Sequence, residues 1–279
     1  MEYIKDSLYN TKLPVLKIDE AKLYNEYPQI GAGSEGSVHK YNDDIAFKTF
    51  VFTPEKDKLL RKFEKIEALG KLHDVSACFP IGLVGYEDEK KEGYYCELVK
   101  SKSEFKIDDF DEIIYLKETK KALEYIVKAS EAIKRFHKKG LILGDIKGDN
   151  IMIDCDDNIK FVDTDNWKYN EFDFDLEPGR TKWLSGLYDK DFSLQDSDKF
   201  VFARLCMQSF LFGTIIRLND RYFQYMIDYL NVSKETKEAL RCIFSDSINK
   251  PYIGDVIKDI DSDEEIISRE HILSLNRVF

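Results

Sequence analysis

The residues best suited to chemistry are grouped around a hairpin that the sequence predicts at residues 151–162, where two short apolar runs flank a turn rich in Asp and Asn. If that turn is centred between Asp156 and the residue after it, Asn150 and Asp163 lie opposite each other, roughly 5 Å apart. An amide oxygen and a carboxylate held side by side suit a hard divalent cation such as Mg²⁺. Asp145 lies in the loop that leads into the hairpin, so we expect the functional site here.

A second candidate is a glycine-rich stretch near the N-terminus, in which Gly31, Gly33 and Gly36 have the spacing G-x-G-x-x-G. In a dinucleotide-binding fold such glycines lead directly into a helix. Here they precede two predicted strands, at residues 37–41 and 45–52. The glycines are therefore predicted at the tip of a hairpin, where backbone N–H groups can approach a phosphate. A hairpin that is merely flexible is the alternative.

Lys48 interrupts the apolar run of the second of these strands. Side-chain alternation places it on the same face as Ala46 and Phe50. One interpretation is a lysine at a sheet edge whose long stem reaches solvent. The other is an ammonium group that binds phosphate beneath the glycine hairpin.

Such a lysine normally needs a carboxylate partner, and the amphipathic helix predicted at residues 56–72 offers two. Glu67 lies close to the apolar stripe of this helix and is the preferred partner of Lys48. Glu64, which flanks the stripe, is the second choice, and Lys65 is expected to point away from the stripe. A glutamate that is simply solvated is the alternative at either position.

The remaining pattern predicts two parts. Strands at residues 78–86 and 93–99 complete a small sheet, and the composition changes at a polar connector, residues 100–109. A long helix follows at residues 116–139. We therefore place a boundary near residue 100.

The composition excludes several classes of protein. With 279 residues, 43% of them hydrophobic and 34% charged, the chain is globular and forms one large domain or two lobes. Its net charge of −11 argues against general nucleic-acid binding and is compatible with basic partners. Its five scattered cysteines indicate reduced thiols in a cytosolic protein, mostly buried. The N-terminus lacks an apolar signal core, and residues 201–218 contain arginines, which favours a buried helix over a membrane span.

Four motifs occur in the order, and at roughly the spacing, of eukaryotic-type protein kinases: Gly31-x-Gly33-x-x-Gly36-x-Val38, Ala46-Phe47-Lys48, Asp145-x-Lys147-x-x-Asn150 and Asp163. Between about residues 28 and 260 the chain resembles this family. The resemblance implies an α+β, two-lobed fold, with a small antiparallel sheet at residues 28–99 and a mainly helical lobe at residues 100–279. Residues 1–27 would form an N-terminal extension.

The resemblance also implies how ATP would bind. The glycine hairpin would cover the phosphates, and Lys48 would bind the α- and β-phosphates, steadied by Glu67 or Glu64. Further nucleotide contacts would come from the adenine pocket, with Cys96 at its back and with Val38, Ala46, Glu97 and Val99 around it.

The transfer itself would depend on four side chains. Asp145 would accept or orient the substrate hydroxyl, and Lys147 would stabilise the phosphoryl group in flight. Asn150 and Asp163 would hold Mg²⁺. Phosphoryl transfer needs positioning and charge neutralisation more than covalent help, and these groups supply both.

The chain departs from the family pattern at two places. Leu143-Gly144 stands where His-Arg is usual, and Thr164-Asp165 stands where Phe-Gly is usual. Without that arginine there is no obvious clamp for a phosphorylated activation loop, and the following loop has few hydroxyls. We therefore expect activity that does not require phosphorylation of this loop. Asp198 would anchor the backbone of the catalytic loop, or would simply cap a helix.

Three functions fit these motifs. The first is ATP-dependent phosphorylation of Ser or Thr in proteins, which Lys147 favours; the acidic loop at residues 163–177 suggests basic substrates, unless it is only a solvated loop. The second is a small-molecule phosphotransferase of the aminoglycoside or choline kinase kind, which Gly144-Asp145 resembles. The third is a nucleotide-binding pseudokinase that acts as a scaffold. The expected location is the cytoplasm, with delivery into a host cell as the alternative.

Overall fold

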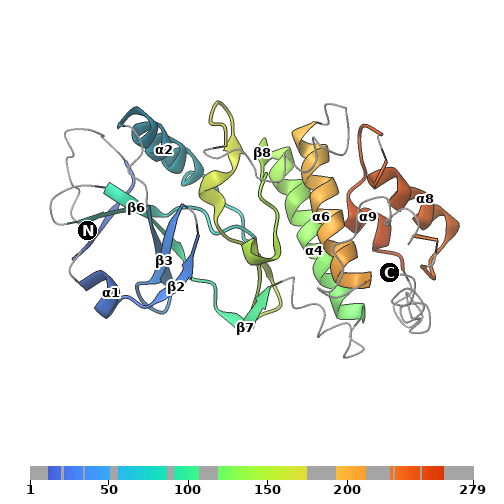
Figure 1. Ribbon diagram of the computed structural model, residues 1–279, viewed down its shortest axis with the longest axis horizontal. Helices are drawn as coiled ribbons and strands as arrows, with labels where there is room; N and C mark the ends of the chain where they lie inside the picture. The colour runs from blue at the N-terminus through green and yellow to red at the C-terminus, as the bar shows by residue number, and fades with distance from the viewer. Residues whose placement is uncertain are drawn as a thin grey trace. The chain divides into compact units, whose positions relative to one another are not determined.

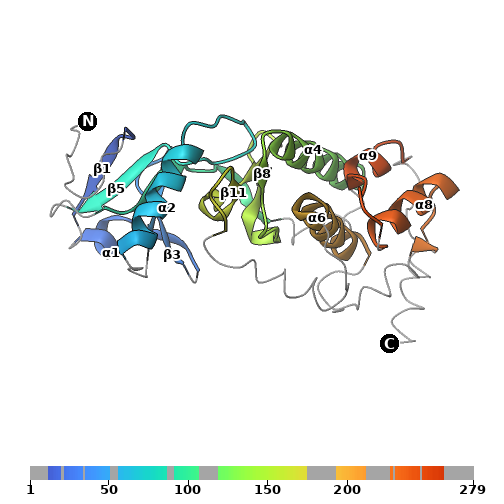
Figure 2. The ribbon, with the colours of Figure 1, turned by 90° about the horizontal axis from the view of Figure 1, so that it is seen from above.

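The computed structural model describes residues 12–19, 22–33, 35–50, 56–86, 91–106, 119–174, 193–211, 227–228, 230–245 and 247–260 (Figures 1 and 2). The acidic loop beyond residue 174, and residues 1–11 of the predicted extension, therefore lie outside the described residues. The chain divides into two compact units. Unit 1 comprises Met1–Lys100 and Lys160–Asp165, and unit 2 comprises Ser101–Ile159 and Asn166–Phe279. The mixed α and β class predicted from the sequence is confirmed.

Unit 1 is built on a six-stranded sheet with the order β1-β5-β6-β4-β3-β2. Its strands are β1 (Val15–Ile18), β2 (Gln29–Ala32), β3 (Gly36–Lys40), β4 (Ile45–Phe50), β5 (Gly82–Tyr86) and β6 (Lys91–Glu97). Neighbouring strands are antiparallel except β1 and β5, which run parallel at one edge (Figure 2). The segment expected to be a polar extension thus supplies an edge strand, and the short helix α1 (Leu23–Glu26) follows it.

Lys48 lies on a central strand of this sheet. In the register of β4 it is opposite Val38 on β3 and Tyr94 on β6. Only 5% of Lys48 is exposed, which excludes the interpretation of a sheet-edge lysine that reaches solvent. A buried ammonium group requires anionic partners, so the position of Lys48 in the fold already calls for nearby carboxylates.

Helix α2 (Lys56–Leu69) covers one face of the sheet (Figure 1). Phe63 and Ile66 on this helix form a core cluster with Val15, Leu83 and Tyr94 from three strands. Burial of a large aliphatic or aromatic side chain contributes about 1.5–3 kcal/mol, so this apolar face holds the helix to the sheet. Lys65, which we expected to point away from the buried stripe, is 1% exposed, and that expectation is wrong.

Unit 2 is mainly helical. Its helices include α4 (Thr119–Lys138), α6 (Leu194–Leu211), α8 (Lys234–Ile243) and α9 (Ile253–Ile257). Helix α4 packs against α6 and α9 (Figure 1). No described helix is long and apolar enough to cross a membrane, and residues 212–218 of the apolar stretch lie outside the described part.

Short strands and turns connect these helices. They are β7 (Ser101–Lys106), β8 (Leu141–Ile142), η3 (Gly148–Asn150), β9 (Ile151–Asp154), β10 (Ile159–Phe161), η4 (Thr164–Asn166) and β11 (Lys168–Tyr169). In unit 2, β7 pairs with β9 and β8 pairs with β11, both antiparallel. Strands β9 and β10 are the two strands of the predicted hairpin, and the chain enters unit 1 within β10.

Gly93→Ala should destabilise unit 1, because a Cβ atom there would lie 1.8 Å from the carbonyl oxygen of Lys48 on the neighbouring strand. Relief of that overlap requires β4 and β6 to separate, and overpacking of this kind costs about 1–3 kcal/mol. Urea unfolding measures the loss. Gly33→Ala is the matched control, since a Cβ there has nothing within 4 Å. We expect the control to change the free energy of unfolding by about 0.5 kcal/mol or less. Equal losses in the two variants would contradict the packing of β4 on β6.

Candidate functional site

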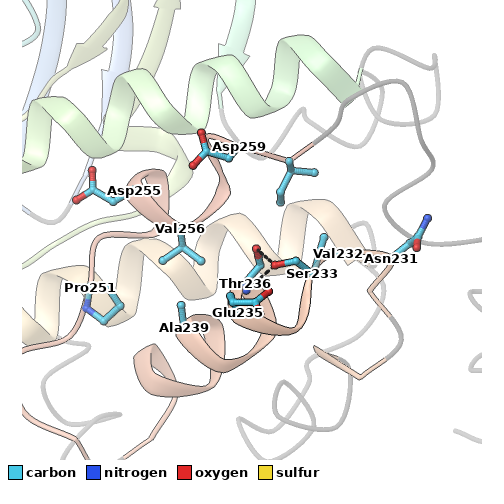
Figure 3. Close-up of a pocket in the computed structure, with 11 residues that line it drawn as sticks. Asn231, Val232, Ser233, Glu235, Thr236, Ala239, Pro251, Asp255, Val256 and Asp259 are labelled. Carbon is cyan, nitrogen blue, oxygen red and sulfur yellow. Dashed lines mark hydrogen bonds between the residues drawn. The ribbon is translucent and has the colours of Figure 1, made fainter.

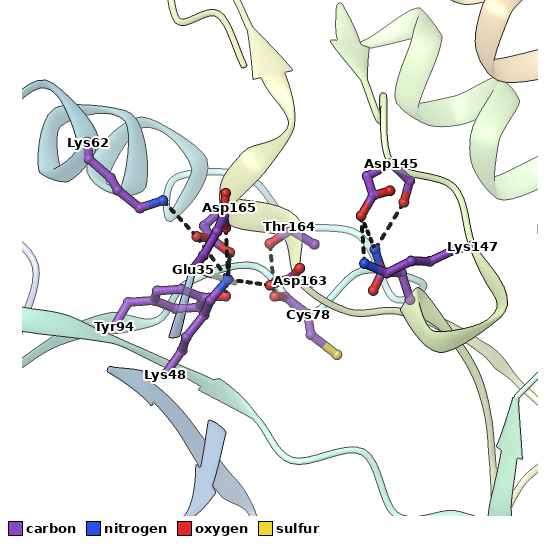
Figure 4. Close-up of polar contacts among 11 residues, drawn as sticks. Glu35, Lys48, Lys62, Cys78, Tyr94, Asp145, Lys147, Asp163, Thr164 and Asp165 are labelled. Carbon is purple, nitrogen blue, oxygen red and sulfur yellow. Dashed lines mark hydrogen bonds and ion pairs between the residues drawn. The ribbon is translucent and has the colours of Figure 1, made fainter. Parts of the chain in front are cut away.

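A buried carboxylate lies at the centre of the polar residues of unit 1. The side chain of Asp165 is 0% exposed, and three groups from three different elements converge on it (Figure 4). It accepts hydrogen bonds from Nζ of Lys48 at 3.0 and 3.3 Å and from the hydroxyl of Tyr94 at 2.8 Å. Nζ of Lys62 on α2 lies 3.1 Å from Oδ2 of Asp165. We call these four residues the Asp165 cluster.

Lys48 contacts two further carboxylates that are more accessible than Asp165. Oδ1 of Asp163 lies 2.5 Å from Nζ of Lys48, and Oε2 of Glu35 lies 3.2 Å from it. Their side chains are 32% and 16% exposed, whereas the Lys48 side chain is 6% exposed. One ammonium group is thus shared among three carboxylates, one of which is fully buried.

The predicted partners of Lys48 on helix α2 are wrong. Glu67 lies 3.7 Å from Lys71 on its own helix, and Glu64 is exposed. The reason is the orientation of the helix. Positions four apart lie on one face, and the face that carries Ile66 to the sheet therefore presents Lys62, a cation. The anion for Lys48 comes instead from the segment after β10.

That segment is held in unit 1 by backbone hydrogen bonds. The N–H of Phe161 donates to the carbonyl of Ser76 at 2.7 Å, and the N–H of Cys78 donates to the carbonyl of Phe161 at 2.9 Å. The buried hydroxyl of Thr164 donates to the carbonyl of Cys78 at 3.1 Å. Asp163 has φ +58°, a left-handed conformation that Asp adopts more readily than most residues. The chain can therefore turn so that both of its acids contact Lys48.

The charges of the cluster support one another. Burial alone would raise the pKa of Asp165, but the ammonium groups of Lys48 and Lys62 and the hydrogen bond from Tyr94 outweigh burial and hold that pKa well below its usual range. Burial would lower the pKa of Lys48, but Asp165, Asp163 and Glu35 together raise it. Burial and then the charge of Asp165 raise the pKa of Asp163. These neighbours therefore favour the charged form of Asp165, whereas burial and the charge of Asp165 favour protonation of Asp163.

The glycines form the hairpin that the sequence predicts. Gly31 lies on β2 opposite Val38 on β3, and the N–H of Gly33 donates to the carbonyl of Gly36 at 2.9 Å to close the tip. A strand follows the glycines, which excludes the strand-to-helix turn of a dinucleotide-binding fold. Glu35, which contacts Lys48, belongs to this tip.

The residues of the predicted adenine pocket lie on β4 and β6. Ala46 is opposite Cys96, whose pKa is raised by burial, and Ile45 is opposite Glu97. The carboxylate of Glu97 accepts two hydrogen bonds from Nζ of Lys160, at 2.9 and 3.0 Å. Val99 follows β6 and is half-buried. The nucleotide role of these residues stays a prediction.

Unit 2 carries a second polar group around Asp145 (Figure 4). Nζ of Lys147 donates to Oδ2 of Asp145 at 2.8 Å. Nδ2 of Asn150 donates to the backbone carbonyl of Asp145 at 3.0 Å and to Oδ2 at 3.2 Å. All three side chains are partly exposed, so the Asp145 carboxylate is held by its neighbours and remains accessible to an incoming group.

Asp198 fixes the backbone of this loop, as one of the two interpretations predicted. Its side chain accepts from the N–H of Leu143 at 2.8 Å and from the N–H of Gly144 at 2.9 Å, and it lies 3.0 Å from Nε2 of His137. The alternative, a helix N-cap, is wrong: Asp198 lies within α6, and the hydroxyl of Ser193 accepts from the first turn of that helix.

Gly144 explains one departure from the family pattern. Its φ is +72°, a conformation that L side chains rarely adopt. A Cβ at this position would also lie 2.4 Å from the ring of Phe174. An arginine would therefore be strained in this loop.

The premise of the predicted metal pair does not hold. The N–H of Asp154 donates to the carbonyl of Asn158 at 2.9 Å, so the hairpin turn is centred on Asp156 itself. The register argument that placed Asn150 opposite Asp163 assumed a different centre and is wrong. A metal role for these two residues, which belong to different units, now depends on the family resemblance alone.

Three acids of unit 1 could hold a cation. Carboxylate oxygens of Glu35, Asp163 and Asp165 lie within 4.8 Å of one another. Oε1 of Glu35 is buried and has no hydrogen-bond partner among the described residues. Oxygen donors of this kind are the ligands that Mg²⁺ prefers, so the donor set fits that ion. In this structure the positive charge next to Glu35 and Asp163 is the ammonium group of Lys48.

Another hollow, in unit 2, has a volume of about 700 Å³ and lies between α8 and α9 (Figure 3). Its polar lining has structural partners: the hydroxyl of Ser233 accepts from the N–H of Thr236 and caps α8, and Asp255 lies 2.7 Å from Nζ of Lys134. We assign no chemistry to it.

A comparison of the sequence with models of known protein families gives no match, and a comparison with curated proteins gives none either. The roles expected of the sequence motifs are therefore supported only by the geometry of the described residues. Sequence reasoning found Lys48 and Asp163 but missed Asp165, Lys62, Tyr94 and Glu35. One signal was present, because Asp165 stands where the family pattern has glycine, and a charged residue in that place demands a partner.

Tyr94→Phe removes one hydrogen bond to the buried carboxylate of Asp165 and leaves the ring in place. Hydrogen bonds to charged groups contribute about 1.5–3 kcal/mol, so we expect the free energy of unfolding to fall by about 2 kcal/mol near neutral pH. Burial and Asp165 raise the pKa of Tyr94 in the folded protein. Its contribution is therefore complete below the ordinary tyrosine pKa of about 10 and is lost as the pH rises through the folded value.

The stability of Tyr94→Phe should consequently decline less steeply than that of the wild type above about pH 10. Urea unfolding of both proteins across the alkaline range measures the two slopes. Parallel slopes would contradict the burial of the Tyr94 hydroxyl against the Asp165 carboxylate.

Proposed function

We propose that the protein is a kinase that transfers the γ-phosphate of ATP to a hydroxyl group, with Ser or Thr of a protein as the acceptor. The observation that carries the proposal is the buried ammonium group of Lys48. It lies within reach of a glycine hairpin and is held by carboxylates at 2.5–3.2 Å, one of which is Asp163. A fixed cation beside a glycine hairpin is an arrangement suited to binding a polyphosphate.

In this proposal the accessible carboxylates exchange with the nucleotide. Phosphate oxygens would replace Glu35 at Lys48, because Glu35 belongs to the hairpin tip and lies at the edge of the cluster. Asp163 would then be available to Mg²⁺, and the ion would neutralise charge on the phosphates. Asp165 cannot exchange in this way, since it is 0% exposed.

Unit 2 would supply the acceptor side of the reaction. The hydroxyl oxygen of the acceptor attacks the γ-phosphorus, its proton passes to Asp145, and the bond to ADP breaks. Lys147, which already contacts Asp145 at 2.8 Å, would stabilise the charge on the transferring group. The hydrogen bonds that Asp198 accepts from the backbone N–H groups of the loop would hold Asp145 in position before the reaction begins.

Two features of the chain bear on the identity of the acceptor. The net charge of −11 favours a basic protein substrate. Gly144, whose left-handed backbone precedes Asp145, is the observation that favours the alternative, a small-molecule phosphotransferase with a Gly-Asp pair in its loop. ATP as donor and the five free cysteines suit the cytoplasm, or a host cell into which the protein is delivered.

Lys48→Met and Asp145→Asn should each lower phosphoryl transfer by about 100-fold or more, because one removes the phosphate-binding charge and the other the proton acceptor. Radiolabel transfer from ATP with Mg²⁺ to a mixture of basic proteins, and separately to small alcohols, measures the effect. Lys71→Met is the matched control, since this lysine side chain is 67% exposed and pairs only weakly on its own helix.

Thermal unfolding with ATP and Mg²⁺ separates the alternatives. A raised midpoint with transfer to proteins supports the proposal, and transfer to small alcohols alone supports the small-molecule enzyme. A raised midpoint without any transfer indicates a scaffold. Neither a shift nor transfer in the wild type would exclude an ATP-dependent enzyme.

A further inference from the structure

We propose that Asp165 is the positioning residue for Lys48, and that with Lys62 it forms an anchor in which helix α2 supplies the cation and the segment after β10 supplies the anion. The assignment of Lys48 to phosphate binding depends on the proposed function. The anchor itself depends only on the contacts of unit 1. It differs from the arrangement expected from the sequence, in which the helix supplies a glutamate.

Asp165 is connected to several elements of unit 1. Its donors come from β4, β6 and α2, and its own backbone is fixed through Thr164 and Cys78. A residue tied to three elements at once cannot move without disturbing each of them. The position of the Lys48 ammonium is therefore set by the same carboxylate that sets the distance of α2 from the sheet.

The three carboxylates around Lys48 differ in their access to solvent. Asp163 and Glu35 are partly exposed, so a phosphate or a cation can reach them. Asp165 is closed to solvent and keeps its charge, because two ammonium groups face it. The buried acid holds the lysine, and the two accessible acids are left to interact with ligands.

Lys48 and Lys62 share one oxygen of Asp165. Nζ of Lys48 and Nζ of Lys62 lie 3.3 and 3.1 Å from the same oxygen, Oδ2 of Asp165. The ammonium groups of Lys62 and Lys48 are thus separated only by the carboxylate of Asp165. A carboxylate placed at position 62 should be able to reach the Lys48 ammonium once Asp165 is removed.

The charge balance makes this arrangement testable. Truncation of one member of a buried, hydrogen-bonded ion pair leaves an uncompensated charge, which is strongly destabilising. Asp165→Gly removes the buried anion between two ammonium groups and leaves only the partly exposed Asp163 and Glu35 at Lys48, so it should lower the midpoint of urea unfolding and loosen the Lys48 ammonium. Lys62→Glu in the Asp165→Gly background should restore both, because it returns the anion and removes the second cation.

The experiment compares four proteins: the wild type, Asp165→Gly, Asp165→Gly/Lys62→Glu and Asp165→Gly/Arg61→Glu. The last is the matched control, because Arg61 lies on the exposed surface of the same helix and undergoes the same change of charge. The ¹H–¹⁵N signal of the Lys48 ammonium group, assigned with Lys48→Arg and recorded at one neutral pH without nucleotide, reports whether this group stays hydrogen-bonded and protected from exchange with water.

We expect the Lys48 ammonium signal to lose protection from exchange in Asp165→Gly, to regain it with Lys62→Glu, and not to regain it with Arg61→Glu. In the transfer assay kcat should fall about tenfold or more in Asp165→Gly, with a smaller change in the KM for ATP, and should recover only with Lys62→Glu. Recovery of stability without recovery of the Lys48 signal would overturn the positioning role. Equal recovery with Arg61→Glu would overturn the anchor.

Two controls keep the outcome decisive. If Asp165→Gly does not fold, Asp165→Asn keeps the shape and a hydrogen-bond acceptor while it removes the charge, and an unchanged Lys48 ammonium signal in that variant would refute the proposal. If the wild type transfers no phosphate, the kinase proposal fails by itself. The protection of the Lys48 ammonium signal in the four proteins then still decides whether Asp165 holds it.

Discussion

The polar centre of unit 1 depends on one buried carboxylate. The side chain of Asp165 is fully buried, and an anion in such a place is stable only with cations and hydrogen-bond donors around it. Those partners come from β4, β6 and α2, so the charge requirement of a single side chain fixes the relation of three elements. Backbone hydrogen bonds between Phe161 and residues 76 and 78 hold the segment that carries this carboxylate in unit 1. Lys48 can then be both buried and charged.

Much of the local structure could be predicted from the sequence. The glycine hairpin, the strand with Lys48, helix α4 and the anchoring role of Asp198 all followed from turn residues, periodicity or the family resemblance. These features depend on nearby residues. The partners of Lys48 could not be predicted in the same way, since Asp165 is 117 positions away in the chain. The choice between Lys62 and Glu67 depended on how α2 is rotated on the sheet, which packing decides.

The two departures from the kinase pattern have physical explanations within this chain. Gly144 has a left-handed backbone next to Phe174, where an arginine would be strained. Asp165 stands where that pattern has glycine, and its charge is balanced by Lys62 from helix α2 together with Lys48.

A structure of the protein with a non-hydrolysable ATP analogue and Mg²⁺ would test the central claim most directly. We predict that the phosphates contact Nζ of Lys48 while Lys48 keeps its hydrogen bond to Asp165, and that Glu35 no longer contacts Lys48. A nucleotide bound elsewhere, or phosphates that replace Asp165 rather than Glu35 at Lys48, would contradict the account.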